Sequence, residues 1–414
     1  MELKPGYKQT EVGVIPEDWE VNKLEKDISL ISGHHVLARY CNSNGEGLPY
    51  ITGPADFPNG VIQHSKFTIK PTTMCRANDI LLTVKGSGAG TLILSDTQYC
   101  ISRQLMAIRT SNWNTRFIYY LLKQDESLFG STATGLIPGL SRGDILNKTI
   151  ITPSLAEQAA IANALSDVDA LIQSLTRLIA KKRQIKQGAM QTLLNPYENG
   201  RLKAGWVVKK LGEITDLLTG FPFSSLGYTN EGIRLLRGSN IKRGQTDWND
   251  EITKCWPSMT SDIRRYELLK GDIVVAMDGS LVGRSFAQLK QSDLPALLLQ
   301  RVARIRSKSE SFDINYIKEW VCSEIFTKHC DSLKTVTAIP HISPANIYNF
   351  VLNVPEQKEE QTRIATILSD MDAEIAALET KLAKYRQIKQ GMMQNLLTGR
   401  IRLVKPESKT GAAA

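Results

Sequence analysis

The chain has 414 residues and a formal net charge of +9. This length suits roughly two to four domains, and a composition of 42% hydrophobic and 22% charged residues excludes wholesale disorder. The basic balance favours a polyanionic partner, nucleic acid first, although many basic proteins bind nothing anionic.

Cysteine usage and the lengths of the apolar runs indicate an intracellular protein. The six cysteines are scattered without a CxxC pair, so reduced thiols are expected and a disulfide framework is not. Residues 1–5 carry no apolar signal region, and the longest apolar runs, such as 273–277, are far short of a membrane span. We therefore expect a cytoplasmic protein with no membrane partner.

The first half of the chain is predicted to be a globular domain followed by a long helix. After an N-terminal segment, 1–18, residues 19–153 combine a β-rich run at 80–84 with glycine turns and a helix around 117–123. This mixture is typical of an α+β domain. The long helix is expected over 154–195.

A heptad pattern predicts this first long helix. Steps of four and three separate its apolar residues, which are Ile161, Leu165, Val168, Ile172, Leu175 and Ile179. Such a seam buries itself against another helix. Ser154 followed by Glu157 predicts an N-terminal capping box, and Asn195-Pro196 ends the helix. About 38 helical residues would extend about 57 Å.

The second half of the chain has the same order of parts. A linker at 196–205 leads to a second globular domain, 206–355, with a β-rich run at 273–276 and helical residues around 316–326.

A second long helix, 356–398, is expected next, with a tail at 399–414. Its seam has the same spacing and consists of Ile364, Leu368, Met371, Ile375, Leu378 and Leu382.

The two long helices are copies of one another. Residues 157–194 align with 360–397 without a gap at an offset of roughly 203, and about 23 of 38 positions are identical. Two seams in one chain favour antiparallel pairing within the chain, with pairing to another chain as the alternative. The globular domains repeat only short strings, such as 78–81 with 271–274 and 136–141 with 338–343.

We therefore predict an α+β protein of two globular domains alternating with two long helices, which pair as an antiparallel coiled coil with pseudo-twofold symmetry. The helices are nearly the same, whereas the globular domains share only scaffold positions. Two copies that differ in this way are expected to bind different ligands.

Three short motifs suggest catalysis or metal binding, but each has a simpler explanation. Residues 85–91 resemble a phosphate loop without the Gly-Lys-Ser/Thr ending, and the second copy, 278–284, keeps only the turn. Asn195-Pro196-Tyr197 is an ordinary helix stop. His34-His35 and His329-Cys330 have no companions at zinc-ligand spacing. We predict no catalytic site and no metal.

Basic and amide side chains are the better functional candidates. Lysine and arginine neutralise phosphates, arginine can also grip guanine, and asparagine and glutamine pair with adenine. The predicted DNA-binding residues are Lys85, Arg103, Gln104, Arg109, Arg234, Arg237, Asn240, Lys242, Arg243, Arg284, Arg301 and Arg304. A wider set adds Arg142, Arg264, Arg265, Gln300 and Arg306. The alternative for any one of them is a solvated charge or the outer face of a strand.

The order of short motifs along the whole chain resembles the type I restriction-modification specificity subunit family. The motifs are residues 6–8 with 13–19, 235–241, 270–274 with 278–280, and the Arg-Gln-Ile-Lys-Gln-Gly strings at 183–188 and 386–391.

This resemblance implies two target-recognition domains, each reading one half of a bipartite double-stranded DNA target. It implies that the paired helices set the spacing and dock two modification (methyltransferase) subunits, which a motor-nuclease restriction subunit joins. S-adenosylmethionine, and ATP with Mg, would be bound by those partners. The basic helix residues are then either a solvated face or contacts with DNA or the partners; they are Lys181, Lys182, Arg183, Lys186, Lys381, Lys384, Arg386 and Lys389.

The two copies differ at positions beside matched glycines. Thr52-Gly53 aligns with Arg237-Gly238, and Lys85-Gly86 aligns with Asp278-Gly279. These differences are candidates for the sequence specificity itself, with simple drift as the alternative.

Two other functions remain open: a DNA-processing enzyme, which would need a cofactor or metal motif, and a coiled-coil adaptor with two protein-binding heads.

Overall fold

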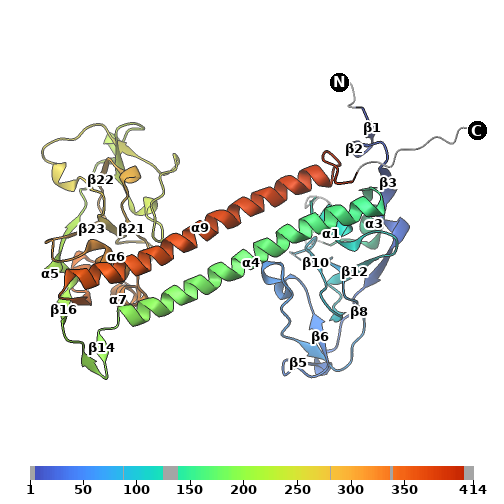
Figure 1. Cartoon of the computed structure of the whole chain (residues 1–414), viewed down its shortest axis with the longest axis horizontal. Helices are drawn as coiled ribbons and strands as arrows, with labels where there is room; N and C mark the ends of the chain where they lie inside the picture. The colour runs from blue at the N-terminus through green and yellow to red at the C-terminus, as the bar shows by residue number, and fades with distance from the viewer. Residues whose placement is uncertain (1–4, 87, 125–138, 280, 336–338, 405–414) are drawn as a thin grey trace, which may run out of the picture. The chain divides into compact units, whose positions relative to one another are not determined.

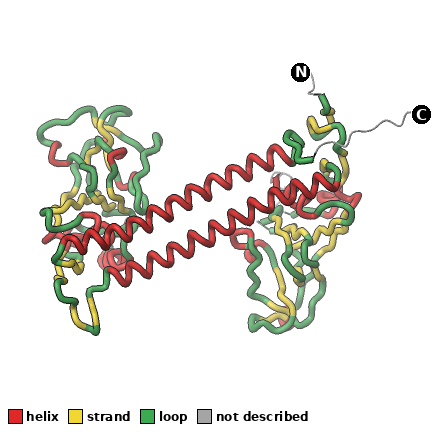
Figure 2. Tube along the Cα trace, in the orientation of Figure 1, coloured by secondary structure: helices red, strands yellow, loops and turns green. Residues whose placement is uncertain are grey.

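The chain folds into two compact units. The computed structural model describes residues 5–86, 88–124, 139–279, 281–335 and 339–404. One unit contains the described residues up to Arg177 together with those from Thr380, and the other is Leu178–Glu379. Each long helix therefore contributes one part to each unit (Figure 1). The predicted α+β class is confirmed, with strands confined to the globular parts (Figure 2).

The first unit holds two main sheets. The four-stranded antiparallel sheet has the order β10-β9-β12-β4, with bounds Leu92–Leu94, Ile80–Thr83, Leu105–Thr110 and Ile28–Ser32. The second sheet has the order β5-β7-β6-β11-β8, with bounds Cys41–Asn42, Phe67–Thr68, Leu48–Ile51, Tyr99–Ile101 and Met74–Cys75. Two further strand pairs are β1 with β2 and β3 with β13, with bounds Tyr7–Thr10, Gly13–Pro16, Glu20–Lys23 and Thr149–Thr152.

The second unit repeats the four-stranded sheet and has a smaller second sheet. Its four-stranded sheet has the order β17-β23-β20-β21, with bounds Thr215–Thr219, Val302–Ser307, Ile273–Ala276 and Phe286–Gln288. Its smaller sheet has the order β19-β18-β22, with bounds Cys255–Trp256, Ile233–Leu236 and Ala296–Leu298. The pairs β16–β24 and β14–β15 have bounds Trp206–Lys210, Val351–Pro355, Tyr197–Glu198 and Arg201–Leu202.

Short helices cover the sheets. In the first unit they are α1 (Thr115–Gln124) and α3 (Arg142–Leu146). In the second unit they are α5 (Leu211–Ile214), α6 (Ile314–Val321), α7 (Glu324–Leu333) and α8 (Pro344–Tyr348). The helix expected around 316–326 is thus two helices, because the Ser323 hydroxyl caps α7 by accepting the Phe326 N–H at 3.3 Å. The predicted matches at 136–138, 338, Ser87 and Ser280 lie outside the described residues.

The long helices are α4 (Leu155–Leu193) and α9 (Lys358–Leu396). Their seam is buried at Leu175, Ile179, Ile375 and Leu382, and half-buried at Val168, Ile172, Met371 and Leu378. In the second unit, Lys182 contacts Glu374 and Lys186 contacts Asp372. Residue numbers therefore rise on α4 as they fall on α9, which makes the pair antiparallel.

The beginning of each seam serves a globular core as well as the helix pair. Ile161 and Leu165 are fully buried in one cluster with Phe117 of α1 and with Leu396 and Leu397 from the end of α9. In the second unit, Ile364 and Leu368 share a cluster with Trp320 of α6 and with Leu194, just after α4. Each globular core is thus completed by the end of the other long helix.

The predicted capping box at Ser154 forms only in part. The Ser154 hydroxyl accepts the Glu157 N–H at 3.4 Å, but the Glu157 carboxylate is held elsewhere. It accepts the Trp19 indole N–H at 3.1 Å and two N–H groups of Arg402 at 2.6 and 2.7 Å. Glu157 therefore ties α4 to residues before and after it in the sequence.

An ion pair between neighbouring strands occurs in both units. Arg109 of β12 donates to both carboxylate oxygens of Asp79 at 2.9 and 2.7 Å, and Arg306 of β23 does so to Asp272 at 2.6 and 2.7 Å. The Asp79 and Asp272 side chains are 4% and 1% exposed. A buried carboxylate needs such a partner, so these arginines belong to the scaffold.

Replacing Arg306 with alanine should destabilise the second unit because it leaves the Asp272 carboxylate buried without its cation. We expect a loss of about 3 kcal/mol in the free energy of unfolding, measured by urea denaturation. Lys26→Ala is the control: its pair with Glu20 is exposed, so its effect should stay below about 1 kcal/mol. Equal effects of the two variants would contradict the scaffold role.

Candidate nucleic-acid interface

The residues predicted to bind DNA fall into two groups in the structure. Some are held by carboxylates and backbone carbonyls of the same unit, and others are exposed at loops. A guanidinium whose N–H groups are already bonded inside the protein has little left to offer a base or a phosphate.

Arg109, Arg284 and Arg304 are held by aspartates, which leaves fewer of their N–H groups for DNA, and their assignment to DNA stays a prediction. Arg109 is the partner of Asp79, as described above. Arg304 pairs with Asp216, and its side chain is only 4% exposed. Arg284 donates to both oxygens of Asp331 at 3.0 and 2.6 Å. Arg284 and Lys334 hold the pKa of the Asp331 carboxyl well below its usual range, as expected for a fixed ion pair.

Arg234 and Asn240 also form hydrogen bonds inside the unit, and their assignment as DNA contacts stays a prediction. Arg234 donates to the carbonyls of Ser292 and Leu294 at 2.8 and 3.0 Å, and its guanidinium lies 4.7 Å from the centre of the Trp248 ring. Asn240 is fully buried. Its amide donates to the Asp247 carbonyl at 2.9 Å and accepts the Arg237 N–H at 3.2 Å, which leaves less of the amide for a base.

Three loops of the first unit converge into what we call the first rim: Thr52, Lys85, Arg103 and Gln104. The Val84 N–H donates to the Gln104 carbonyl at 2.7 Å, which joins the loops after β9 and before β12. A Cβ added to Gly53 would lie 2.7 Å from Oε1 of Gln104, so the glycine admits this side chain. Lys85, Arg103 and Gln104 are exposed.

The equivalent loops of the second unit form the second rim: Arg237, Asp278, Gln300 and Arg301. The Met277 N–H donates to the Arg301 carbonyl at 2.9 Å. Arg301 contacts Asp278 at 2.9 Å and is 63% exposed. A Cβ on Gly238 would lie 3.6 Å from the Asp278 carboxylate, so the Arg237 loop joins the same group. Arg237 is half-buried. Arg301 has a φ of 67°, which is rare for a residue other than glycine.

The two rims share a pattern of backbone hydrogen bonds, but the side chains at equivalent positions differ. By their backbone bonds, Gln104 corresponds to Arg301, and hence Arg103 to Gln300. Lys85 corresponds to Asp278 and Thr52 to Arg237. Gln300 belongs to the wider predicted set, whereas Thr52 and Asp278 are predicted only through the mismatches between the two copies. The signal that marks Thr52 and Asp278 is the mismatch beside the glycines that the two copies share.

Lys242 and Arg243 are exposed but are not tied to the second rim by the contacts of the described residues. Lys242 lies 3.7 Å from Asp247, and Arg243 forms a bridge with Phe286 of β21. In the wider set, Arg142 donates to the Leu30 carbonyl at 3.0 Å. These residues stay predictions, separate from the rims.

The described part of the chain lacks two kinds of feature. No group of three or more histidine, cysteine, aspartate or glutamate side chains could hold a metal ion. Among the described helices, none is long and apolar enough to cross a membrane.

The fold and the rims define a duplicated protein that presents two related but chemically different surfaces. A family model described as the type I restriction modification DNA specificity domain matches residues 16–187 and again 203–389. The chain belongs to this family. The sequence-based recognition of the family is therefore confirmed.

Individual relatives agree with this assignment. The type I restriction enzyme MjaVIII specificity subunit of Methanocaldococcus jannaschii is 28% identical over 404 residues, covering 94% of each chain. The EcoAI specificity subunit of Escherichia coli is 30% identical over 204 residues, covering 49% of this chain and 34% of that protein. A crystal structure of a type I restriction-modification S subunit from M. genitalium has a TM-score of 0.65, 16% identity and coverage of 96% and 98%, which shows a shared fold.

Replacing Arg237 with alanine should weaken DNA binding or relax the sequence read by the second unit, by about 1–3 kcal/mol for a contact to a base. Electrophoretic or anisotropy titrations against a randomised half-site would measure this. Arg284→Ala is the matched control, since Arg284 is committed to Asp331: it should affect stability and leave the preferred sequence alone. If Arg284→Ala changed the preferred sequence and Arg237→Ala did not, the assignment of Arg237 to the interface would be wrong.

Proposed function

We propose that this chain is the DNA-specificity subunit of a type I restriction-modification complex, and that each unit reads one half of a bipartite duplex target through its rim. The observation that carries this proposal is the pair of rims. Equivalent loops present Lys85, Arg103 and Gln104 in one unit, and Arg237 and Arg301 in the other.

The side chains of the rims suit base edges in the major groove. Arginine can donate two hydrogen bonds to guanine, and glutamine can pair in two places with adenine. The Arg-Gln order of residues 103–104 is reversed at 300–301. Different donors at equivalent positions support two half-sites of different sequence.

We further propose that the long helices dock two copies of a modification subunit. The string Arg-Gln-Ile-Lys-Gln-Gly is identical in both helices, and its isoleucines, Ile185 and Ile388, are 47% and 40% exposed. Gly188 and Gly391 lie inside helices, where glycine costs about 0.5–1 kcal/mol. A Cβ at either glycine would meet nothing within 4 Å. No contact within the described chain requires glycine at these two positions, whereas a partner that packs closely against the helix would require it. Two equal surfaces also suit two equal partners.

The proposal assigns chemistry to the partners and recognition to this chain. S-adenosylmethionine would be bound by the modification subunits, and ATP with Mg by the motor-nuclease subunits. This chain would act without catalysis of its own, in the cytoplasm.

Methylome sequencing tests the proposal directly. A methylation-free host that expresses this chain with its modification subunit should acquire methyladenine in both halves of one bipartite motif. The host that lacks this chain should acquire none. If the subunits assemble and no methylation appears, the proposal fails and the adaptor function is favoured.

The spacing role predicts the effect of lengthening the helices. Four residues inserted after Thr176, matched by four after Glu379 at the equivalent position of α9, add about 6 Å to each helix. The gap in the methylated motif should lengthen by about two base pairs, with both half-sites unchanged. A four-residue insertion at Gly200, in the exposed β14–β15 turn, is the control and should leave the gap as it was. An unchanged gap in the helix variant would exclude the spacing role.

A further inference from the structure

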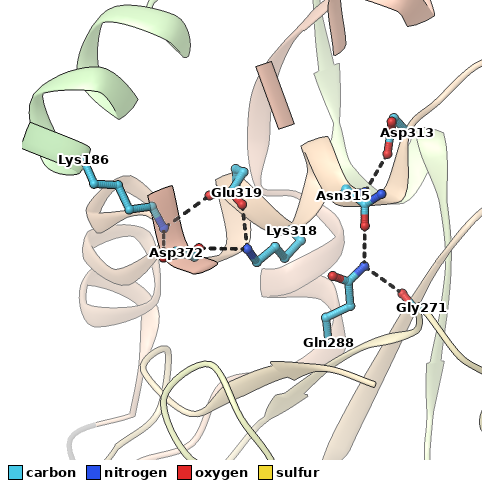
Figure 3. Close-up of polar contacts among 8 residues, drawn as sticks. All are labelled: Lys186, Gly271, Gln288, Asp313, Asn315, Lys318, Glu319 and Asp372. Atoms are coloured by element: carbon cyan, nitrogen blue, oxygen red, sulfur yellow. Dashed lines mark hydrogen bonds and ion pairs between the residues drawn. The ribbon is translucent and has the colours of Figure 1, made fainter. Parts of the chain in front are cut away.

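A charged cluster joins both long helices to the second globular part. Nζ of Lys186 on α4 lies 2.6 Å from Asp372 on α9 and 3.8 Å from Glu319 on α6. Lys318, also on α6, contacts Glu319 at 2.6 Å and Asp372 at 3.2 Å. Figure 3 shows the four side chains pointing toward one another. Glu319 is fully buried and Lys186 is 15% exposed, whereas Asp372 is 43% exposed, so water screens the lysine side of the cluster less than the aspartate side.

The first unit has a counterpart of this cluster. Nζ of Lys389 on α9 lies 2.6 and 2.8 Å from the two carboxylate oxygens of Asp169 on α4. Tyr120 on α1 donates to Asp169 at 2.8 Å, and the Lys389 ammonium lies 5.3 Å from the centre of its ring. Burial raises the pKa of the Tyr120 hydroxyl, which therefore stays protonated as a donor.

The two Lys–Asp pairs are equivalent by the internal repeat. Lys186 and Lys389 are the same position of the Arg-Gln-Ile-Lys-Gln-Gly string, and Asp169 and Asp372 lie in the same Leu-Ser-Asp-x-Asp string. Each pair joins a lysine in the last third of one long helix to an aspartate in the first half of the other. Both pairs form at one and the same antiparallel register.

An apolar seam does not select this register by itself. Heptad seams bury similar surface after a slip of seven residues, whereas a charged group at the seam tolerates only the register that supplies its partner. The residues seven positions from Lys389 and Lys186 are all aliphatic: Leu382, Leu396, Ile179 and Leu193. A slip of one heptad would therefore set both aspartates against hydrocarbon.

We propose that Lys186–Asp372 and Lys389–Asp169 are register locks: positioning residues that select one pairing of α4 with α9 and thereby one gap length in the DNA target. The inference rests on the proposed spacing role of the helices. A slipped pairing would displace the helices by about 10 Å along their axis, which corresponds to about three base pairs.

Exposed ion pairs on the same helices provide the control. Lys182–Glu374 and Arg183–Glu379 also join α4 to α9, but their side chains are 33–64% exposed. Water screens such pairs and replaces their hydrogen bonds when they break. They are expected to add little to the choice of register.

The test compares two chains with four substitutions each, expressed in full with the modification subunit. The unlocked chain carries Lys186→Met, Lys389→Met, Asp169→Leu and Asp372→Leu. The control chain carries Lys182→Met, Arg183→Met, Glu374→Leu and Glu379→Leu. Methylome sequencing should show the native gap alone in the control, and methylation at gaps changed by about three base pairs in the unlocked chain.

An unlocked chain that methylates only the native gap overturns the proposal. If that chain does not assemble, Lys389→Asp alone is compared with Lys389→Asp combined with Asp169→Lys. The exchange should restore methylation of the native gap that the single substitution loses, and an exchange as defective as the single variant overturns the locks. Absence of any bipartite methylation by the unsubstituted chain is a different result, because it refutes the proposed function itself.

Discussion

The structure depends on one constraint: neither globular core is complete without the end of the long helix that belongs to the other repeat. Leu396 and Leu397 fill the first core beside Ile161, and Leu194 fills the second beside Ile364. A globular part of this size buries little surface to spare, so folding of each unit requires that α4 and α9 be paired. The antiparallel helix pair is therefore part of both cores and more than a connection between them.

The sequence was sufficient for the features that rest on local pattern. Heptad spacing predicted both long helices and their buried seams, because the period of apolar residues directly reports which face is covered. It was insufficient for the basic residues. Arg109 finds its aspartate 30 residues away, Arg284 finds Asp331 47 residues away, and Arg304 finds Asp216 88 residues away. Sheet pairing brings together the first and third of these pairs, and helix α7 carries Asp331 to Arg284. No local pattern shows such contacts, so scaffold and surface arginines look alike in the sequence.

Comparison of the two copies separates positions that the fold needs from positions that it leaves open. The Arg–Asp pair occurs in both copies, as Arg109–Asp79 and Arg306–Asp272. Loss of either partner would leave the other charge without its counter-ion inside the unit. Residues 103–104 and 300–301 exchange glutamine and arginine, because exposed loop side chains can change with little effect on stability. The same physical distinction explains how two units of one backbone can recognise two different ligands.

One charged pair would fix the register of α4 and α9 if both helices were rigid. Because they are not rigid, two locks are needed. A long helix can change its pairing part-way along where a π-bulge shifts its backbone register, so a pair in one unit does not fix the register in the other. A lysine–aspartate pair in each unit closes this route. The partners beneath the pairs differ: the Tyr120 hydroxyl lies beneath one, and the Glu319 carboxylate with its own counter-ion, Lys318, lies beneath the other. Each combination leaves its cluster without net charge, which is the condition for placing a lysine at an otherwise apolar junction.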